Sequence, residues 1–368
     1  MKIARLKKRE VLKSFLVENF GIFLTILALV VISSVNQLSM GGTKSYFWRN
    51  LLWHFIGLIV FFVIFLSIDY RKITLKAVYL LYTGLLILIG IMDLFKTRWI
   101  NLGFISIQPS EFIKPLLALI FSLEAEKASS SVLPSRVFLK LLLTMGIGIL
   151  LIFITDLDYA FIIGVTFFTF LLFLGVPKRI FFSLLAVVIL IVVTLGPFAW
   201  RHVLKPHQKG RIYGYLHPEK YASSWGYQMN QSLIAIGSGG LFGQGFKKGW
   251  STRLNYLPAK RTDLAFSVWA ESWGFIGVTI FLFLYAYLLY YTLYVSSMAR
   301  DWLGKYLSFV IGLILFWQAF FNIGGATGLL PMTSIPLPFL SYGGSITISV
   351  YFLLSLLFNI AFKRYFFK

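Results

Sequence analysis

The run NFGIFLTILALVVISSVNQ, residues 19–37, decides the fold class of this chain. It contains no charged residue, and a helix of about 20 apolar residues matches the ~30 Å hydrocarbon core of a bilayer. Basic residues precede it, as in a signal peptide, but no small-residue cleavage site follows and many further apolar runs do. We therefore expect an uncleaved first transmembrane helix.

The rest of the chain repeats this pattern. Of 368 residues, 58% are hydrophobic and 13% are charged, and the mean hydropathy is +0.82, so a soluble fold could not bury the apolar surface. The sequence predicts an all-α polytopic membrane protein with about ten transmembrane helices in a single membrane domain, residues 1–368. Apolar segments are expected at 19–37, 51–68, 75–95, 110–124, 137–155, 158–175, 180–200, 264–290, 305–322 and 345–362.

The distribution of lysine and arginine predicts the orientation. With the N-terminus inside, the cytoplasmic segments hold 19 of these residues, and the short outer loops hold four: Lys44, Arg49, Lys96 and Arg98. Cytoplasmic loops of membrane proteins carry such an excess. We expect both termini on the cytoplasmic side of the membrane. Anionic lipid headgroups then account for the net charge of +21, and nucleic acid is not expected as a partner.

Two stretches are neither spans nor short turns. Residues 201–263 form a long segment on the extracellular side, and residues 323–344 form a second segment that is rich in Gly and Pro and has no charge. Loops of this length are usually functional or disordered. Their apolar and aromatic content favours a partly structured loop that packs on the outer mouth of the bundle.

Metal and thiol chemistry find little support in the sequence. There are no cysteines, and the four histidines, His54, His202, His207 and His217, show no ligand spacing. Each histidine is more simply explained as an interfacial or loop residue. No protein metal site is therefore predicted.

Asp263 is the sharpest candidate for chemistry. It lies at the outer end of the eighth predicted span, directly after Lys260, Arg261 and Thr262. Ionisable groups at the end of a span are functional candidates, because they are costly to bury. A helix cap is an equally good explanation from position alone, since Thr and Asp satisfy free amides in a first turn.

The fourth predicted span carries a second charged group. In QPSEFIKP, residues 108–115, Glu111 and Lys114 lie three apart on one helical face. They form either an internal ion pair or the polar lining of a cavity, and the two interpretations are compatible. This span is the weakest of the ten because of these charges, and alone it could be re-entrant. Arg98 precedes it, either as a phosphate-binding group or as an interfacial anchor.

Weaker candidates surround these groups. Glu271 follows Asp263 by eight residues, about 80° around a helix, and either shares a cavity wall with it or faces a neighbouring helix. Asp156 and Asp158 flank a tight outer turn, and the turn explanation is preferred for Asp158. The glycine-rich run at 226–246 matches no phosphate-loop spacing, but it sets polar side chains beside the membrane surface: Gln228, Gln231, Ser232 and Ser238.

Four motifs taken together resemble the RodA/FtsW/SpoVE family of shape, elongation, division and sporulation proteins. The resemblance covers essentially the whole chain in the expected order, and the run IAIGSGG looks more like RodA than FtsW. The motifs are QPSEFIKP at 108–115, the Gly-Tyr-Gln to Gly-Ser-Gly-Gly run at 226–240, YLPAKRTDLAFSVWAESWGFIG at 256–277 and NIGGATGLLPMTSIPLPFLSYGGS at 322–345.

The resemblance implies a peptidoglycan glycosyltransferase that polymerises lipid II at the outer face of the cytoplasmic membrane, beside a class B penicillin-binding protein that crosslinks the product. The essential aspartate of the family's His-Thr-Asp-Phe motif maps onto Asp263. The family's polar motif residues map onto Glu111 and Lys114, its Arg-Trp pair onto Arg98 and Trp99, and the aspartate of its Pro-Asp-Leu-Gly turn onto Asp156.

This chain departs from the family's pattern in three places. The His-Thr-Asp-Phe motif reads Arg261-Thr262-Asp263-Leu264, so no imidazole is needed there. The Pro-Asp-Leu-Gly turn reads Thr155-Asp156-Leu157-Asp158, which puts a role for Asp156 in doubt. The usual Glu-Glu pair reads Glu271-Ser272.

The mechanism expected from these groups is an inverting glycosyl transfer. Asp263 would accept the proton of the attacking 4-hydroxyl, and Arg98, Lys114, Lys260 and Arg261 are candidates to stabilise the departing diphosphate. A divalent cation, Mg²⁺ or Mn²⁺, could share that role. Two rival hypotheses are a lipid II flippase and a scaffold that recruits a transpeptidase. The candidate residues cluster near the outer side, which favours the enzyme over the flippase.

Overall fold

The computed structural model describes residues 2–41, 44–95, 97–101, 103, 106–127 and 135–366. Lys96, which entered the orientation argument, lies outside the described residues. Long helices dominate the fold, as the sequence predicts. They are α1 Lys2–Glu18, α2 Phe20–Ser39, α3 Ser45–Ser67, α4 Leu75–Leu94, α5 Ser110–Glu126, α6 Ser135–Thr155, α7 Leu157–Phe173, α8 Lys178–His202, α12 Ala265–Met298, α13 Trp302–Ala326 and α14 Gly344–Lys363.

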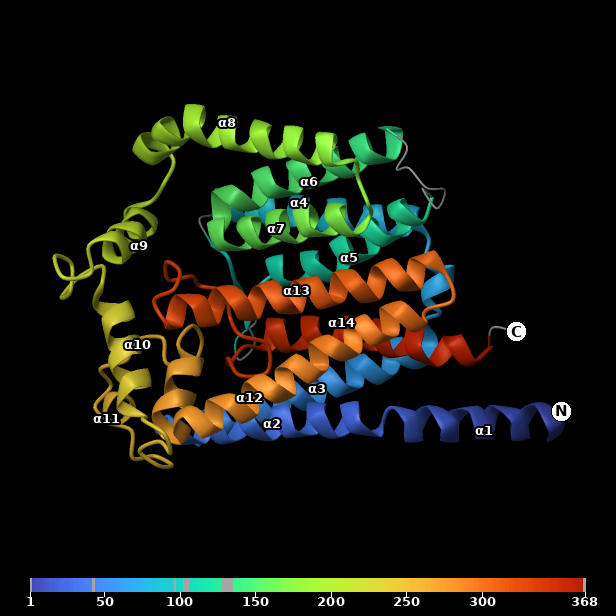
Figure 1. The fold of residues 1–368 in the computed structure, drawn as a ribbon, viewed down its shortest axis with the longest axis horizontal. Coiled ribbons are helices and arrows are strands. Elements are labelled where there is room, and N and C mark those ends of the chain that lie inside the picture. The colour runs from blue at the N-terminus through green and yellow to red at the C-terminus, as the bar shows by residue number, and fades with distance from the viewer. Residues whose placement is uncertain are drawn as a thin grey trace.

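These helices form one bundle of roughly parallel and antiparallel rods (Figure 1). Each of the ten predicted apolar segments coincides with a helix, and seven helices in the described part are long and apolar enough to cross a membrane. Both termini lie at the same end of the bundle (Figure 1), which agrees with N-in and C-in topology. The prediction of a polytopic all-α protein is confirmed, and the total of ten spans remains a prediction.

Burial differs sharply between the helices. The central helices α13 and α14 are mostly covered by their neighbours, whereas α8 has no buried residue and lies along the upper edge in Figure 1. In water an exposed helix as apolar as α8 would be unstable, but the acyl chains of a bilayer are an equally apolar surrounding. The helix α5, the weakest predicted span, is almost entirely buried against α13, α4 and α14.

The end of the bundle opposite the termini carries the irregular structure (Figure 1). The long segment after α8, for which the sequence predicts a partly structured loop, is partly helical, and a short hairpin joins α4 to α5 with Ile100 opposite Ile107. The helix α12 is broken near its outer end by Gly274, whose φ of 62° favours glycine. The additional elements are α9 Pro206–Leu216, α10 Tyr227–Ser238, α11 Trp250–Arg253, β1 Ile100–Asn101 and β2 Ser106–Ile107.

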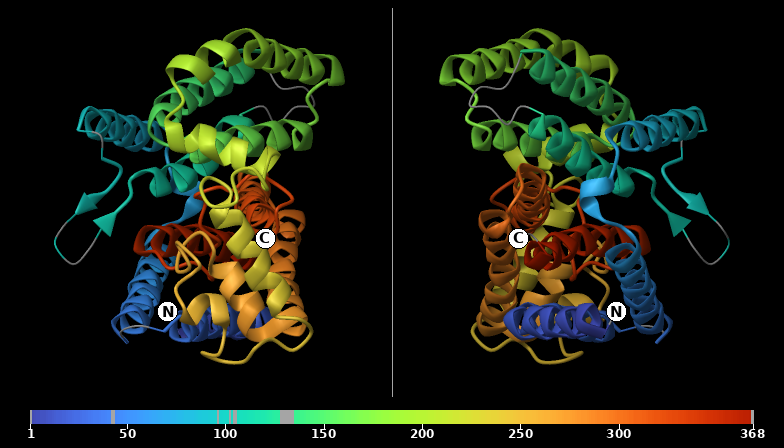
Figure 2. Two further views of the ribbon diagram at one scale, coloured as in Figure 1. Left: turned by 90° about the vertical axis from the view of Figure 1, so that its left-hand side faces the viewer. Right: turned by 90° about the vertical axis from the view of Figure 1, so that its right-hand side faces the viewer.

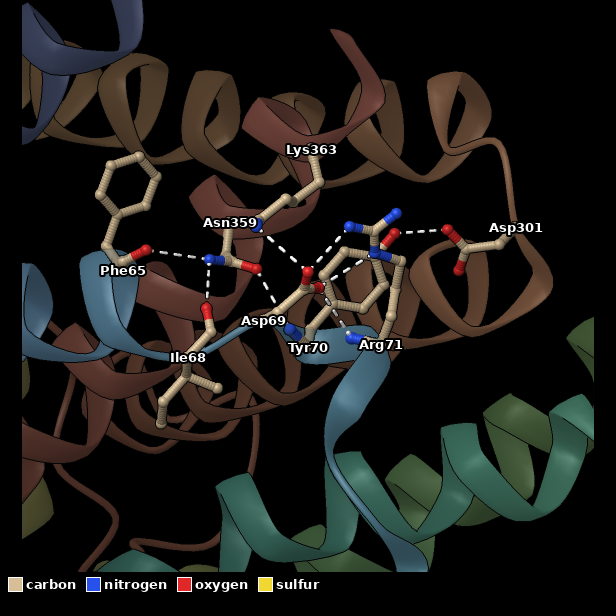
Figure 3. Close-up of polar contacts among 8 residues, drawn as sticks. All are labelled: Phe65, Ile68, Asp69, Tyr70, Arg71, Asp301, Asn359 and Lys363. Atoms are coloured by element: carbon tan, nitrogen blue, oxygen red, sulfur yellow. Dashed lines mark hydrogen bonds and ion pairs between the residues drawn. The ribbon is translucent and has the colours of Figure 1, made fainter. Parts of the chain in front are cut away.

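A polar cluster locks the end of the bundle that carries the termini (Figure 3). Asn359 of α14 donates to the carbonyls of Phe65 and Ile68, at 3.0 and 2.8 Å, and accepts from the amide of Tyr70. The Tyr70 hydroxyl donates to Asp301, which begins α13. The turn after α3 includes one short 3₁₀ helix, Tyr70–Lys72. These contacts fix the turn to α13 and α14. A second 3₁₀ helix, Arg364–Phe366, follows α14.

Candidate functional site

A cavity of about 190 Å³ lies at the outer end of the bundle, where the long predicted loops meet the helix ends. Its walls come from the segment before α5, the start of α7, the segment before α12, the loop after α13 and the start of α14. The lining residues are Arg98, Trp99, Gln108, Glu111, Asp156, Thr262, Asp263, Ser334, Pro336, Tyr342, Gly343, Ser345 and Ile346. Residues far apart in the sequence therefore form one polar site.

Asp263 lies in this cavity on a rigid segment that precedes α12. The backbone carbonyl of Asp263 accepts from Asn322 Nδ2 at 2.9 Å, and the carbonyl of Thr262 accepts from Ser341 Oγ at 2.5 Å. The amide of Tyr342 donates to the Arg261 carbonyl at 2.7 Å. Asn322 of α13 and the loop after α13 thus hold the segment on one side, so the backbone of Asp263 is fixed where this residue lines the cavity.

The helix-cap explanation for Asp263 does not match this geometry. The helix α12 begins at Ala265, and its N-cap is Leu264, with no side-chain cap hydrogen bond. Burial raises the pKa of Asp263, while the Thr262 side chain and the charge of Arg211 oppose the rise. A carboxylate with a raised pKa is a stronger base when it is ionised.

Arg98 and Asp156 form an ion pair on the opposite wall. Arg98 Nη1 lies 3.1 Å from Asp156 Oδ2, and Asp156 is 4% exposed. Burial raises the pKa of Asp156 to about 7, and the Arg98 charge opposes this rise. Arg98 is the one basic side chain among the described residues that line the cavity.

Glu111 and Lys114 form a second ion pair below the cavity. Lys114 Nζ lies 2.6 Å from Glu111 Oε2, and 5.0 Å from the centre of the Tyr159 ring. Both side chains are buried, and of the two only Glu111 lines the cavity. The second carboxylate oxygen of Glu111 has no protein partner among the described residues. The ion-pair and cavity-lining interpretations from the sequence therefore hold together for Glu111.

Lys260 and Arg261 are turned away from the cavity. Lys260 Nζ donates to the Thr252 carbonyl at 2.8 Å and to Asn255 Oδ1 at 2.6 Å. Arg261 donates to the Gly41 carbonyl at 2.6 Å and lies over the ring of Tyr46, with 4.1 Å from its guanidinium carbon to the ring centre. In this conformation both side chains brace the outer loops.

The structure also places Glu271 outside the cavity. Its carboxylate accepts from the amides of Ser251 and Thr252, at 2.7 and 3.2 Å, and from the Thr252 hydroxyl at 2.5 Å. It therefore caps the short helix α11, because the first amides of a helix need external acceptors. Of the two interpretations left open, Glu271 faces a neighbouring element and does not share a wall with Asp263.

The polar residues of the glycine-rich run lie on α10, beside α12. Ser232 is fully buried, and its Oγ lies 2.7 Å from Ser267 Oγ and donates to the Ala326 carbonyl at 2.6 Å. Gln228 and Gln231 are half-buried on the same helix and are not among the residues that line the cavity. The run joins α10 to α12 and α13.

A group around Asp158 was missed by the sequence argument, which assigned this residue to a turn. Asp158 Oδ2 accepts from Arg211 Nη1 at 2.8 Å and from the amide and hydroxyl of Ser334, at 2.7 and 2.6 Å. The group joins α9 and α7 to the cavity wall. The wall residues Gln108, Tyr342 and Ser345 were also missed, although they lie within or beside the quoted motifs. These three polar residues lie in stretches with little or no charge, and that feature could have marked them as candidates for the cavity wall.

The carboxylates of the cavity do not offer a resident metal site. Asp156 and Glu111 are bound to Arg98 and Lys114, which leaves Asp263 as the remaining acidic ligand. Within the described part of the chain, no group of three or more His, Cys, Asp or Glu side chains could hold a metal ion. The residues therefore do not fit a protein-bound Mg²⁺ or Mn²⁺.

Comparisons with known proteins agree with the architecture. The model of the FtsW/RodA/SpoVE family, described as a cell cycle protein, matches residues 14–365. The peptidoglycan glycosyltransferase MrdB of Escherichia coli strain K12 is 33% identical over 279 residues, which cover 72% of each chain.

Two solved structures share the fold. A chain from a peptidoglycan synthase complex, solved in a study of how polymerization and crosslinking are coordinated, superposes with a TM-score of 0.77 at 24% identity, over 94% of this chain and 98% of that chain. The rod shape determining protein RodA of Thermus thermophilus superposes with a TM-score of 0.68 at 22% identity, over 94% of this chain and 97% of that chain.

Proposed function

Because this chain belongs to the FtsW/RodA/SpoVE family and is a multi-pass inner-membrane peptidoglycan glycosyltransferase of the RodA type, we propose that it polymerises lipid II into β-1,4-linked glycan strands. The reaction takes place at the outer face of the membrane, during cell elongation and shape maintenance. The position of the cavity supports this site, because it opens at the end of the bundle opposite both termini.

We identify the general base by asking which carboxylate of the cavity is not held in an ion pair. Three carboxylates line the cavity: Asp156 pairs with Arg98 and Glu111 pairs with Lys114. Asp263 forms no ion pair with any described basic side chain, so its carboxylate remains available to take a proton. We assign it as the general base.

The proposed step is a displacement at the anomeric carbon of one lipid-linked sugar. The 4-hydroxyl of the second chain forms a new C–O bond on the face opposite the diphosphate, and its proton goes to Asp263. The C–O bond to the diphosphate breaks, and its electron pair leaves with undecaprenyl diphosphate. Inversion of an α-linked donor gives the β-1,4 bond.

The leaving diphosphate needs positive charge at the opposite wall. We place it at Arg98, which is 31% exposed and has donors beyond the one bound to Asp156. Lys114, Lys260 and Arg261, the other proposed clamps, bind other groups in this conformation. Gln228, Gln231, Ser232 and Glu271 then support the outer loops that surround the substrate.

A class B penicillin-binding protein is the partner that we propose for crosslinking. The support is the shared fold with a chain from a synthase complex that coordinates polymerization with crosslinking. The lipid tails of the substrate would remain in the bilayer beside the bundle. No metal step is included, because the residues of the cavity do not fit one.

The test is polymerisation of purified lipid II by the reconstituted protein, alone and with its transpeptidase. We expect glycan strands from the wild type and none from Asp263→Asn, a variant of equal size. A matched control is Asp93→Asn, a carboxylate at the end of α4 that does not line the cavity. Unchanged polymerisation by Asp263→Asn would refute the base, and lipid scrambling without polymer would favour the flippase.

A further inference from the structure

A segment at the outer rim of the bundle, residues 239–256, exposes a surface that the glycosyl transfer does not use. We call it the rim segment. Six large apolar or aromatic side chains on it are between 42% and 76% exposed. They are Leu241, Phe242, Phe246, Trp250, Leu254 and Tyr256. Such a concentration of exposed apolar side chains marks an interaction surface.

The rim segment is fixed to α12 by backbone hydrogen bonds. The amides of Gln244 and Gly245 donate to the carbonyls of Glu271 and Ser272, at 2.9 and 3.0 Å. In return, the amides of Phe275 and Ile276 donate to Gly240 and Leu241, at 2.9 and 3.1 Å. The break at Gly274 releases these groups from the helix.

Glycine is required at this contact. A Cβ on Gly274 would lie 2.3 Å from the amide nitrogen of Gly243, and a Cβ on Gly243 would lie 2.3 Å from the Ser272 carbonyl oxygen. Both residues also have positive φ angles, 62° and 81°. The rim segment therefore has a fixed height along α12.

That height is close to the outer end of α12. The helix α12 has 34 residues, and a span needs roughly 20 of them. We take the part that crosses the hydrocarbon core to begin near Met298, beside the cytoplasmic Arg300, and therefore to end at about residue 278, within the apolar segment 264–290. The backbone bonds hold the rim segment beside residues 271–276, just beyond that point. The neighbouring lipid-facing side chains of α12, Phe275 and Phe283, are 65% and 72% exposed.

The rim segment also lies at the edge of the molecule. Seen from the outer side in the left view of Figure 2, the yellow and gold loops close the lower rim of the bundle, beyond the ends of α2 and α12. The rim segment therefore lies beside the outer end of α12.

The charges of the rim segment complement phosphate groups. Lys247, Lys248 and Arg253 are exposed, and the sequence from 220 to 262 contains no Asp or Glu. None of the three forms an ion pair with a described carboxylate. Lys247 lies over the ring of Phe246 and Arg253 over that of Trp250, each at 5.3 Å from the ring centre. Aromatic and basic side chains that alternate in this way are typical of a membrane interface.

We propose that the rim segment is an outer-leaflet anchor that inserts its aromatic side chains at the headgroup level and binds anionic phospholipids through Lys247, Lys248 and Arg253. The anchor is joined to the segment that precedes α12 and carries Asp263, because Lys260 donates to the Thr252 carbonyl. It is also joined to α12 itself, because the Thr252 amide donates to Glu271. Anchoring therefore fixes the height of the outer loops relative to the lipid headgroups.

The absence of cysteine allows a direct measurement of depth. A spin label at Phe242→Cys is examined in nanodiscs of phosphatidylcholine with phosphatidylglycerol, by power saturation with oxygen and with a water-soluble nickel complex. Phe283→Cys serves as the lipid-exposed reference, and Ser223→Cys, on an exposed part of the outer segment, serves as the water-exposed reference. An unchanged oxygen accessibility at the Phe283 label establishes that each preparation is folded.

The measured quantity is the ratio of oxygen accessibility to nickel accessibility at each label. We expect this ratio to be at least several-fold higher for the Phe242 label than for the Ser223 label. The label should also lie deeper in phosphatidylglycerol than in pure phosphatidylcholine, and Lys247→Gln with Lys248→Gln should abolish that difference. A Phe242 label as exposed to nickel as the Ser223 label would overturn the anchor and favour a protein partner for this surface. Equal depth in both lipids would overturn the binding of anionic phospholipid.

Discussion

The ammonium of Lys114 lies 2.6 Å from the carboxylate of Glu111, one helical turn away on α5, and both side chains are buried. Tyr159 covers the lysine from α7. The pair therefore forms the floor of the cavity, and through Glu111 alone it reaches the space where substrate would lie. Lys114 therefore contributes to the packing of α5 and not to the lining of the cavity, whereas Glu111 does both.

Removing one partner of this pair should destabilise the protein strongly. Lys114→Met leaves a buried carboxylate without its counter-charge, and we expect a loss of about 3–5 kcal/mol in unfolding free energy. The double change with Glu111→Gln should cost less than the sum of the single changes. Lys140→Met is the matched control, because Lys140 is 52% exposed in its pair with Glu124 and should cost about 1 kcal/mol or less. Unfolding in detergent measures all four variants, and additive effects would contradict the pairing.

The rate of polymerisation should depend on the ionisation of Asp263. The base must be charged to accept a proton, and burial raises its pKa above the usual range. Activity should therefore be full at high pH and fall as the pH drops through this raised value. Asp263→Asn should lower the rate by roughly 10²–10⁴-fold at high pH, where the wild-type carboxylate is ionised, and the difference should shrink as the pH falls. A wild-type rate that stays constant down to the ordinary pKa of an aspartate would argue against this role.

Asp156 should make the protein less stable as the pH rises. An ordinary aspartate in an ion pair has a lowered pKa and does the reverse. Its pKa is about 7 in the folded protein and 3.8 ordinarily, so the folded state holds the proton more tightly. Stability from this group is present below the ordinary pKa and is lost as the pH rises toward 7. Asp156→Asn should gain stability relative to wild type between pH 4 and 8, by at most about 4 kcal/mol at 1.36 kcal/mol per pKa unit.

The thermal midpoint of each protein, measured across that pH range, checks this expectation. Asp158→Asn serves as a comparison, because it removes a neighbouring carboxylate that is bound to Arg211 and Ser334. A wild-type minus Asp156→Asn difference that does not change with pH would mean that Arg98 keeps Asp156 ionised throughout.

Glu271 should act through structure. Its carboxylate satisfies two amides and one hydroxyl of α11, so Glu271→Gln should cost about 1–3 kcal/mol in stability. Thr252→Val removes one of the same bonds, and the two changes together should be less than additive. The pH profile of polymerisation should be unaltered in Glu271→Gln. An altered profile would place Glu271 in the chemistry after all.

Much of the fold followed from the sequence because burial in lipid imposes a strict rule. Every backbone amide in the bilayer core must be satisfied within the span, so an uncharged run such as residues 19–37 can only form a helix. The positions of Lys and Arg then predict the direction of each helix. For the same reason the helices were predicted closely even where, as at α5, charged residues interrupt the apolar pattern.

The site was only partly predictable. Asp263, Glu111 and Arg98 stood out because charges near a membrane are costly. The same argument drew attention to Lys260, Arg261 and Glu271, whose partners lie in the outer loops. Asp158 could not be recognised in this way, because a carboxylate in the first turn of a helix resembles any turn residue until folding brings Arg211 and Ser334 to it.

The sequence by itself determined that this chain is a membrane-spanning bundle and which family it belongs to, since hydropathy and motifs are properties of local segments. Only the tertiary structure decided which carboxylate of the cavity forms no ion pair with a described basic side chain and which outer segment exposes its apolar side chains. Those properties depend on distances between residues that are remote along the chain: Asp156 from Arg98, Glu271 from Thr252, and Gly243 from Gly274. Two charges pair, and two backbones pack closely, only when folding brings them within a few ångströms of each other, and the order of residues along the chain does not specify this.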